Sequence, residues 1–188
     1  MEPVSISEGT CGKWSVVRFS VSEADAKFTV LRAAMKGRGY VPPGTYTRLN
    51  CKGRGIVMSD TPDEMRDHRY AVQRAQGHVL LNGLGIGMVL TNILKKECVT
   101  AVTVVEIDAD VIALVGPNYT DPRVTIIHES AFEYAPPKAV RYGAVWHDIW
   151  DTICGDNLTQ MTKLKRKYGR RADWQGCWCE YECKRYSR

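Results

Sequence analysis

The chain has 188 residues, of which 44% are hydrophobic and 25% charged, and its formal net charge is +5. This length suits one domain with its own core, and this composition excludes a disordered or fibrous protein. The excess positive charge lies in residues 163–188, which hold nine Lys and Arg against three Asp and Glu. Such a segment can bind nucleic acid, but a solvated charged surface is the commoner cause, so nucleic acid is not the favoured partner.

The N-terminus and the cysteines indicate a cytoplasmic protein. The chain opens on Met1-Glu2-Pro3, without the basic and apolar stretches of a secretory signal. Seven cysteines, an odd number, are typical of reduced thiols. The stretch 78–94 carries no formal charge but contains Asn82, Asn92 and three glycines. We interpret it as a strand, a loop and a helix, and predict no membrane span.

Residues 1–58 are expected to form a small β-rich N-terminal segment. A helix is predicted near 23–36, because Ser22 and the acidic residues after it form a helix start and apolar residues then recur at helical spacing. Short strands are predicted at 45–49 and 55–58, and the glycine-rich turn 51–54 joins them as a hairpin.

Residues 59–168 alternate between helices and apolar strands. A helix is expected from Thr61-Pro62-Asp63-Glu64, which combines a capping hydroxyl, a proline and an acid three residues after the cap, to about Gln76. The elements expected after it are strand 78–82, loop 83–87, helix 88–96, strand 99–107, helix 108–115, strands 123–128 and 139–149, and helix 156–168. Strands rich in Val, Ile and Leu between helices are typical of a parallel sheet buried on both faces. The predicted fold is therefore α/β, with a Rossmann-like, mostly parallel sheet and helices on both faces.

Residues 169–188 form a basic tail that contains Cys and Trp and shows no clean period. Cys177, Cys179 and Cys183 suggest zinc, but their spacing lacks an obvious fourth ligand. We therefore predict no metal site.

A glycine loop and an acidic residue together indicate a nucleotide pocket. The strand at 78–82 runs into Gly83, Gly85 and Gly87 and then into a helix, so the backbone can approach a ligand and point free N–H groups at it. A second strand ends in Glu106, about twenty residues on, where a carboxylate can accept hydrogen bonds from both hydroxyls of a ribose. We predict an adenosine-containing ligand. The alternative is that the glycines only pack the strand against the helix and Glu106 only caps a helix.

The residue after the loop distinguishes between adenosine ligands. Dinucleotide fingerprints need a glycine three residues after the second one, where this chain has Met88. S-adenosylmethionine carries no phosphate, and its amino-acid end needs only a few backbone amides and carboxylates. The predicted cofactor is therefore S-adenosylmethionine.

Four segments then resemble the successive motifs of the spermidine-synthase-like branch of class I S-adenosylmethionine-dependent methyltransferases. They are Val79–Gly87, Val102–Asp108, Asp121–His128 and Tyr142–Trp150. The resemblance covers about residues 55–168. It implies methionine-end contacts near Gly83–Gly87, ribose contacts at Glu106 with Ile107 beside it, and adenine contacts near Ser130 and Ala131.

Departures from this family bear on the reaction. Aminopropyltransferases of the superfamily typically have an acidic Gly-Gly-Gly-Asp-Gly-Gly loop, a Tyr-His-Glu element and an Asp-Ser-x-Asp-Pro strand end. Only His68 and Asp148 match these motifs, and the loop has Leu84 and Ile86 in place of an acid. A polyamine needs several carboxylates to offset its desolvation, so aminopropyl transfer is placed second.

The end of the strand at 139–149 is expected to hold the acceptor. Asp148 is the predicted catalytic residue, which orients an amine or acts as a base, with capping of the next helix as the alternative. His147 and Trp150 are predicted to bind substrate, with a structural histidine and an ordinary core aromatic as the alternatives.

The predicted function is a methyltransferase that acts on an unidentified acceptor, such as a small molecule. The alternatives are an aminopropyltransferase and a non-catalytic module that binds S-adenosylmethionine. No clear set of final strands follows the helix at 156–168, so we expect a sheet edge that a second copy of the chain covers, in a homodimer.

Overall fold

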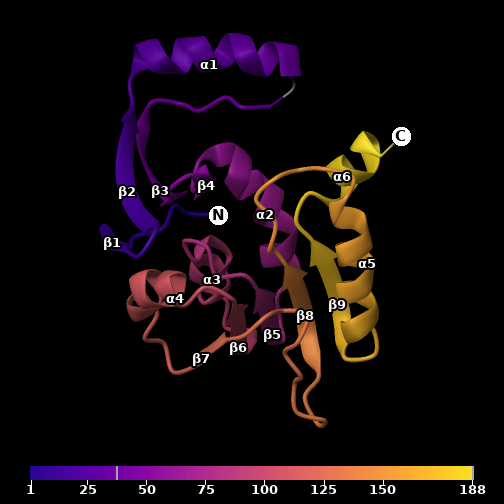
Figure 1. The fold of residues 1–188 in the computed structure, drawn as a ribbon. Coiled ribbons are helices and arrows are strands. Elements are labelled where there is room, and N and C mark those ends of the chain that lie inside the picture. The colour runs from indigo at the N-terminus through magenta and orange to yellow at the C-terminus, as the bar shows by residue number, and fades with distance from the viewer. Residues whose placement is uncertain (37, 188) are drawn as a thin grey trace.

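The computed structural model describes residues 1–36 and 38–187, which form two β-sheets with helices packed around them (Figure 1). The first sheet has the strand order β1-β2-β3-β4 and is antiparallel throughout. The second has the order β7-β6-β5-β8-β9 and is parallel throughout. The predicted fold class is confirmed, as is the β-rich segment before the parallel sheet.

The first sheet comes from the N-terminal third of the chain. Its elements are β1 (Gly9–Cys11), β2 (Trp14–Val21), α1 (Glu23–Lys36), β3 (Gly44–Cys51) and β4 (Gly55–Ser59). The helix predicted at 23–36 is confirmed, and the strands predicted at 45–49 and 55–58 lie within β3 and β4. Strands β1 and β2 were not predicted. Figure 1 shows α1 apart from the second sheet, and its Phe28 and Met35 are exposed.

The second sheet alternates with helices along the chain. Its elements are α2 (Pro62–Arg74), β5 (Gly77–Asn82), α3 (Met88–Ile93), β6 (Val99–Glu106), α4 (Ala109–Val115), the 3-10 turn η1 (Gly116–Asn118), β7 (Val124–His128), β8 (Tyr142–His147), α5 (Asn157–Tyr168), β9 (Ala172–Cys177) and α6 (Glu180–Tyr186). The central strand β5 pairs with β6 on one side and with β8 on the other. All five strands run the same way, so their carboxyl ends meet at one edge of the sheet.

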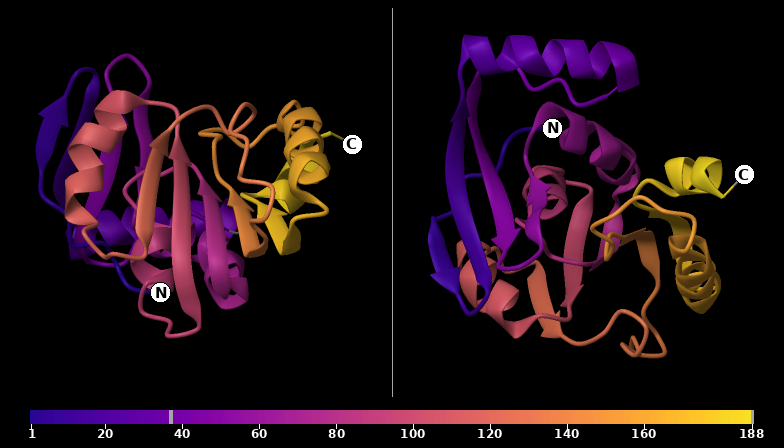
Figure 2. Two further views of the ribbon diagram at one scale, coloured as in Figure 1. Left: turned by 90° about the horizontal axis from the view of Figure 1, so that it is seen from below. Right: turned by 45° about the horizontal axis from the view of Figure 1, so that its top comes forward.

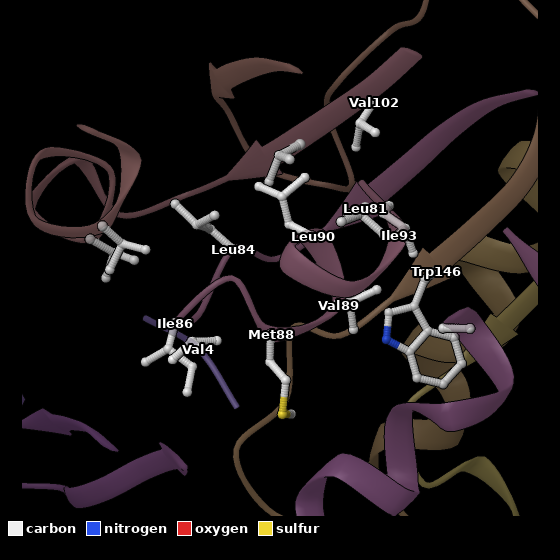
Figure 3. Close-up of a cluster of buried hydrophobic side chains, with 14 of the residues drawn as sticks. Val4, Leu81, Leu84, Ile86, Met88, Val89, Leu90, Ile93, Val102 and Trp146 are labelled. Carbon is white, nitrogen blue, oxygen red and sulfur yellow. The ribbon is translucent and has the colours of Figure 1, made fainter. Parts of the chain in front are cut away.

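The parallel sheet is buried on both faces. Neighbouring residues of β5 point to opposite faces, and each face packs against its own hydrophobic cluster. Val79 and Leu81 belong to a cluster with residues of α2, α3 and α4, part of which Figure 3 shows. Leu80 belongs to a second cluster with Leu164 and Tyr168 of α5. Helices therefore cover both faces, as the near-continuous apolar runs predicted. No helix in the described ranges is long and apolar enough to cross a membrane.

The main difference from the predicted elements lies after residue 168. No clear set of final strands was predicted in residues 169–188, but β9 is the edge strand of the parallel sheet and α6 follows it (Figures 1 and 2). The sequence Ala-Asp-Trp-Gln-Gly-Cys alternates apolar and polar residues over only four positions and contains no apolar run. Tertiary packing supplies what the pattern lacks, because the ring of Trp174 stacks on that of Trp146, with centroids 6.2 Å apart.

Candidate functional site

A cavity of about 670 Å³ lies at the carboxyl edge of the parallel sheet, a volume within the range of small-molecule sites. The parallel sheet contributes Gly83, Gly85, Glu106, Ser130, Asp148 and Trp150 to its lining. The antiparallel sheet contributes Lys13, Trp14, Leu49, Arg54, Val57 and Met58. The cavity therefore has one wall from each sheet.

The three glycines of the loop all adopt the left-handed backbone conformation, with φ of 103° at Gly83, 52° at Gly85 and 73° at Gly87. A side chain would be strained at each position and would also meet another group of the protein. These groups are the backbone carbonyl of Asp148, the sulfur of Met58 and the hydroxyl of Tyr119, respectively. Gly83 and Gly85 line the cavity, whereas Gly87 packs against Tyr119 outside it.

Glu106 ends β6 beside this loop and is buried. The Leu84 amide donates a hydrogen bond of 2.9 Å to its Oε2, and the Asp108 amide donates one of the same length to its Oε1. These two bonds fix the plane of the carboxylate at the cavity wall. A carboxylate can accept about four hydrogen bonds, so each oxygen retains a lone pair for a ligand hydroxyl.

Ile107, which follows Glu106, also lines the cavity, as do Ser130 and Ala131, the residues predicted near an adenine. The loop at 130–132 is fixed by two kinds of contact. The Phe132 amide donates to the Ser130 hydroxyl at 3.2 Å, and Lys167 of α5 donates to the carbonyl of Phe132 at 2.7 Å. Helix α5 therefore holds this part of the cavity wall in place.

Asp148 follows β8 and lines the cavity. Because β5 lies between β6 and β8 in the sheet, Asp148 and Glu106 lie on opposite sides of the glycine loop. The amide of Asp148 donates to the carbonyl of Asn82 at 2.8 Å, which fixes the backbone at the strand end. Burial, together with the negative charges of Glu64, Glu106 and Asp67, raises the pKa of its carboxyl to about 8. A carboxyl with this pKa can take up or release a proton near neutral pH, which suits a general base or acid.

Glu64 was predicted only as a helix-capping residue, and the structure places it in the cavity wall. Its carboxylate accepts hydrogen bonds from the amide and the hydroxyl of Ser59, at 2.7 and 2.8 Å, instead of capping the Thr61 end of α2. Burial raises the pKa of Glu64 as well. The helical spacing of Glu64 and His68, four residues apart, is the signal that could have placed both on one face of α2.

His68 is the second contribution of α2 to the cavity. Its side chain is 1% exposed, and its Nδ1 lies 3.6 Å from Oδ2 of Asp148. Burial lowers the pKa of this imidazole to about 3, so the ring is neutral at physiological pH.

The two residues predicted to bind substrate have different positions. Trp150 lines the cavity, and its indole N–H donates to Gln160 at 2.8 Å. His147 lies outside the lining and is fully buried, with its ring nitrogens 2.8 Å from the amide nitrogen of Asn82 and 3.4 Å from the amide oxygen of Gln175. Neighbouring residues of a strand point to opposite faces, so Asp148 reaches the cavity and His147 does not. His147 therefore lies away from the cavity that Asp148 and Trp150 line.

The N-terminal wall is held against the parallel sheet by polar contacts that sequence reasoning missed. The indole N–H of Trp14 donates to Asp108 at 2.7 Å, and the ammonium of Lys13 lies 3.2 Å from the same carboxylate. Arg54, in the β3–β4 turn, forms an ion pair with Asp151. Trp178, just after β9, also lines the cavity. No local pattern marks these residues, because each contact joins distant segments.

The basic and cysteine-containing C-terminal segment has internal roles within the described ranges. Lys165 pairs with Glu180 at 3.0 Å, and Arg171 donates to the carbonyl of Pro137 at 2.9 Å. Among residues 1–36 and 38–187, no three His, Cys, Asp or Glu side chains gather as a metal site would require. This part of the basic charge holds the fold together.

Comparisons with known proteins place this site in a family. The model of the spermine/spermidine synthase domain matches residues 64–165, which is more than half of the chain. No curated protein matches the sequence.

Several solved structures are similar at low identity. A 23S rRNA methyltransferase, ErmE, is 18% identical with a TM-score of 0.46, and the match covers 62% of this chain and 46% of that one. A precorrin 8W decarboxylase from Methanobacterium thermoautotrophicum is 13% identical with a TM-score of 0.46, over 60% of this chain and 58% of that one. A dimethyladenosine transferase from Plasmodium falciparum is 18% identical with a TM-score of 0.41, over 54% and 37%. The chain thus spans less than two thirds of each of these proteins.

The family match begins at Glu64, passes through the glycine loop, Glu106 and Asp148, and ends within α5. It therefore covers all the residues from Glu64 to Gln160 that line the cavity. The chain belongs to the spermine/spermidine synthase domain family.

Proposed function

We propose that the chain is a transferase that binds S-adenosylmethionine in the cavity and moves its methyl group to an acceptor held at Asp148. The observation that carries this proposal is the arrangement of Glu106 and Asp148 on opposite sides of the glycine loop, in one cavity of about 670 Å³. In an open parallel sheet, ligands bind outside the carboxyl ends of the strands, which is where both carboxylates lie.

The residues present fit the nucleoside. The free lone pairs of Glu106 suit the two ribose hydroxyls, and the buried Ala131 with Ile107 offers apolar surface for the adenine. S-adenosylmethionine supplies an alkyl group already activated on its sulfonium, so the protein chiefly has to position the acceptor and remove a proton. In this proposal, Asp148 takes that proton and Trp150 contacts the acceptor.

Calorimetry of the purified chain tests the nucleoside site. S-adenosylmethionine and S-adenosylhomocysteine are expected to bind with micromolar dissociation constants, on the order of −8 kcal/mol. Glu106→Ala should abolish binding, because it removes the carboxylate that accepts from the ribose. Glu97→Ala is the matched control, since Glu97 is exposed and lies outside the cavity lining. Unchanged binding by Glu106→Ala would refute the ribose assignment.

Aminopropyl transfer is the second candidate, and the structure strengthens it. The sequence motifs contain too few carboxylates for a polyamine. In the structure, however, Glu64, Glu106 and Asp148 all line the cavity, and Asp67 lies close enough to raise the pKa of Asp148. Four acidic side chains around one site favour a cation there. Methyl transfer stays first because the loop residues Leu84 and Ile86 are buried and apolar, where aminopropyltransferases have an acid.

The two transfers differ in the nucleoside that binds. Tighter binding of decarboxylated S-adenosylmethionine than of the intact cofactor would favour the aminopropyl donor, and the reverse order would favour methyl transfer. A mass-spectrometric assay across a panel of amines then detects a gain of either group. Nucleoside binding with no product from any acceptor would instead support a module without turnover.

A further inference from the structure

His68 is a buried polar side chain that the fold itself leaves unsatisfied. Its side chain is 1% exposed, and within the described residues neither ring nitrogen has a hydrogen-bond partner. Buried polar groups without partners are rare and destabilising, so each one calls for an explanation such as a catalytic role or a bound water. A purely structural residue at this position would be an apolar one of similar size.

The packing around His68 holds its ring in one orientation. The ring of Trp146 meets it edge to face, with centroids 5.9 Å apart, and Trp146 is stacked in turn on Trp174. The remaining direction leads to Asp148, whose Oδ2 lies 3.6 Å from Nδ1. That separation is longer than a hydrogen bond, and a small movement of the carboxyl closes it. Catalytic hydrogen bonds often tighten only when a ligand binds.

The charges around Asp148 make such a partner necessary. Glu64 and Asp67 face it from α2 and Glu106 faces it from β6, and all three favour its protonated form. The nearby cations are engaged elsewhere, since Arg38 pairs with Asp67 at 2.6 Å and Arg54 pairs with Asp151. A neutral imidazole is therefore the group within reach that can donate a hydrogen bond to the ionised carboxylate.

We propose that His68 is a positioning residue for Asp148: its neutral ring donates Nδ1–H to Oδ2 of the carboxylate, orients the carboxylate toward the acceptor and stabilises its ionised form relative to its protonated form. The other nitrogen, Nε2, then carries a lone pair. The indole N–H of Trp146, whose ring packs against that of His68, is also without a hydrogen-bond partner within the described residues. Proton uptake from the acceptor falls to Asp148, so this inference rests on the proposed function.

Two conservative substitutions separate positioning from packing. The side-chain amide of Asn branches at Cγ, as Nδ1 does, so His68→Asn keeps a donor near Asp148. The amide of Gln lies one carbon further out, near the position of Nε2, so His68→Gln loses that donor while it keeps a polar side chain. His68→Phe removes both nitrogens and keeps the ring.

The first measurement needs no activity. The carboxyl of Asp148 is titrated by carbon-13 NMR in the full chain and assigned by the signal that Asp148→Asn removes. The wild-type midpoint is expected near pH 8. His68→Asn should keep it, whereas His68→Gln and His68→Phe should move it to higher pH by about one unit, because the ionised form loses its donor. Equal midpoints in all four proteins would overturn the proposal, and circular dichroism identifies a variant that fails to fold.

The second measurement is the pH profile of transfer. His68→Gln should lower kcat/KM about tenfold near pH 7 and recover as the pH rises above the new midpoint, with KM for the nucleoside unchanged. His68→Asn should follow the wild type. If the chain binds no nucleoside but the NMR midpoints move as described, the proposed function fails and the pairing of His68 with Asp148 stands. A tenfold loss in His68→Gln that persists at every pH would show a packing defect instead.

Discussion

The two walls of the cavity are built in different ways. The wall from the parallel sheet consists of strand ends and one glycine loop, tied together by backbone hydrogen bonds such as the one from the Gly83 amide to the carbonyl of Val105. The wall from the antiparallel sheet consists of side chains on its strands and turns, held by Trp14 on Asp108 and Arg54 on Asp151. The first wall should therefore be rigid and intolerant of added side-chain volume, and the second should be more easily deformed. Four substitutions test this contrast, in order of decreasing effect on stability.

Gly83→Ala should have the largest effect, because it strains the rigid wall. The φ of 103° is unfavourable for alanine, and its Cβ would overlap the backbone carbonyl of Asp148. We expect a loss of about 3 kcal/mol in the free energy of unfolding, measured by denaturant titration. Gly55→Ala is the control, since Gly55 has a φ of 87° but open space at the Cβ position. A similar loss in both variants would mean that conformation alone, and not close packing, constrains Gly83.

Asp148→Asn should stabilise the protein. The carboxyl has a pKa of about 8 in the fold against an ordinary value of 3.8, so between these pH values the native state binds more protons than the unfolded chain. The free energy of unfolding of the wild type therefore falls as the pH rises through this window. An amide does not titrate, so the variant should gain on the order of 2 kcal/mol at pH 8 and nothing at pH 4, measured as Tm across pH. Its transfer activity should be lost, and a gain that is independent of pH would contradict the assignment.

Trp14→Phe tests the hydrogen bond that holds the wall from the antiparallel sheet to Asp108. It removes the indole N–H that donates to Asp108 at 2.7 Å and keeps most of the buried ring. We expect a loss of about 1 kcal/mol, because Lys13 still neutralises the carboxylate. Faster dissociation of the nucleoside should accompany it, measured by stopped-flow fluorescence. A loss as large as that of Gly83→Ala would show that the two walls are equally rigid.

Arg54→Ala should have the smallest effect on stability. Arg54 is 57% exposed, and exposed ion pairs contribute less than about 1 kcal/mol. Because Arg54 and Asp151 both line the cavity, we expect the nucleoside to associate faster in the variant while Tm stays within about one degree. Association rates that are unchanged at low and high salt would mean that this pair does not restrict entry.

The same contrast explains what could be predicted from the sequence. Gly83, Gly85 and Glu106 lie within motifs whose spacing is set by the strand, loop and helix around them, so their positions at the cavity follow from local pattern. Trp14 and Trp178 reach the cavity only through tertiary contacts, and no period in the sequence marks them. His147 shows the opposite case. It lies next to Asp148 in the sequence, but strand alternation turns it away from the cavity.

Glu64 shows how one residue can satisfy two interpretations. An acid three residues after Thr61 is typical of a helix start, and the helix does begin there. Its carboxylate nevertheless turns toward Ser59 and the cavity, and that choice depends on β4 being next to α2 in space. For this reason, the sequence motifs alone indicate too few carboxylates at the site. They therefore understate the case for a cationic acceptor.

The position of β5 at the centre of the parallel sheet also affects how the chain folds. Its partner β8 is far along the chain, as Asn82 and His147, paired at the strand ends, are 65 residues apart. On a ribosome, Leu80 and Leu81 emerge long before β8 does and pair first with β6 alone. Parallel pairing over such separations forms slowly and leaves apolar strand surface exposed meanwhile. Newly made chains should therefore depend on chaperones until β8 is complete, and the glycine loop can take its final shape only after Asp148 has been added.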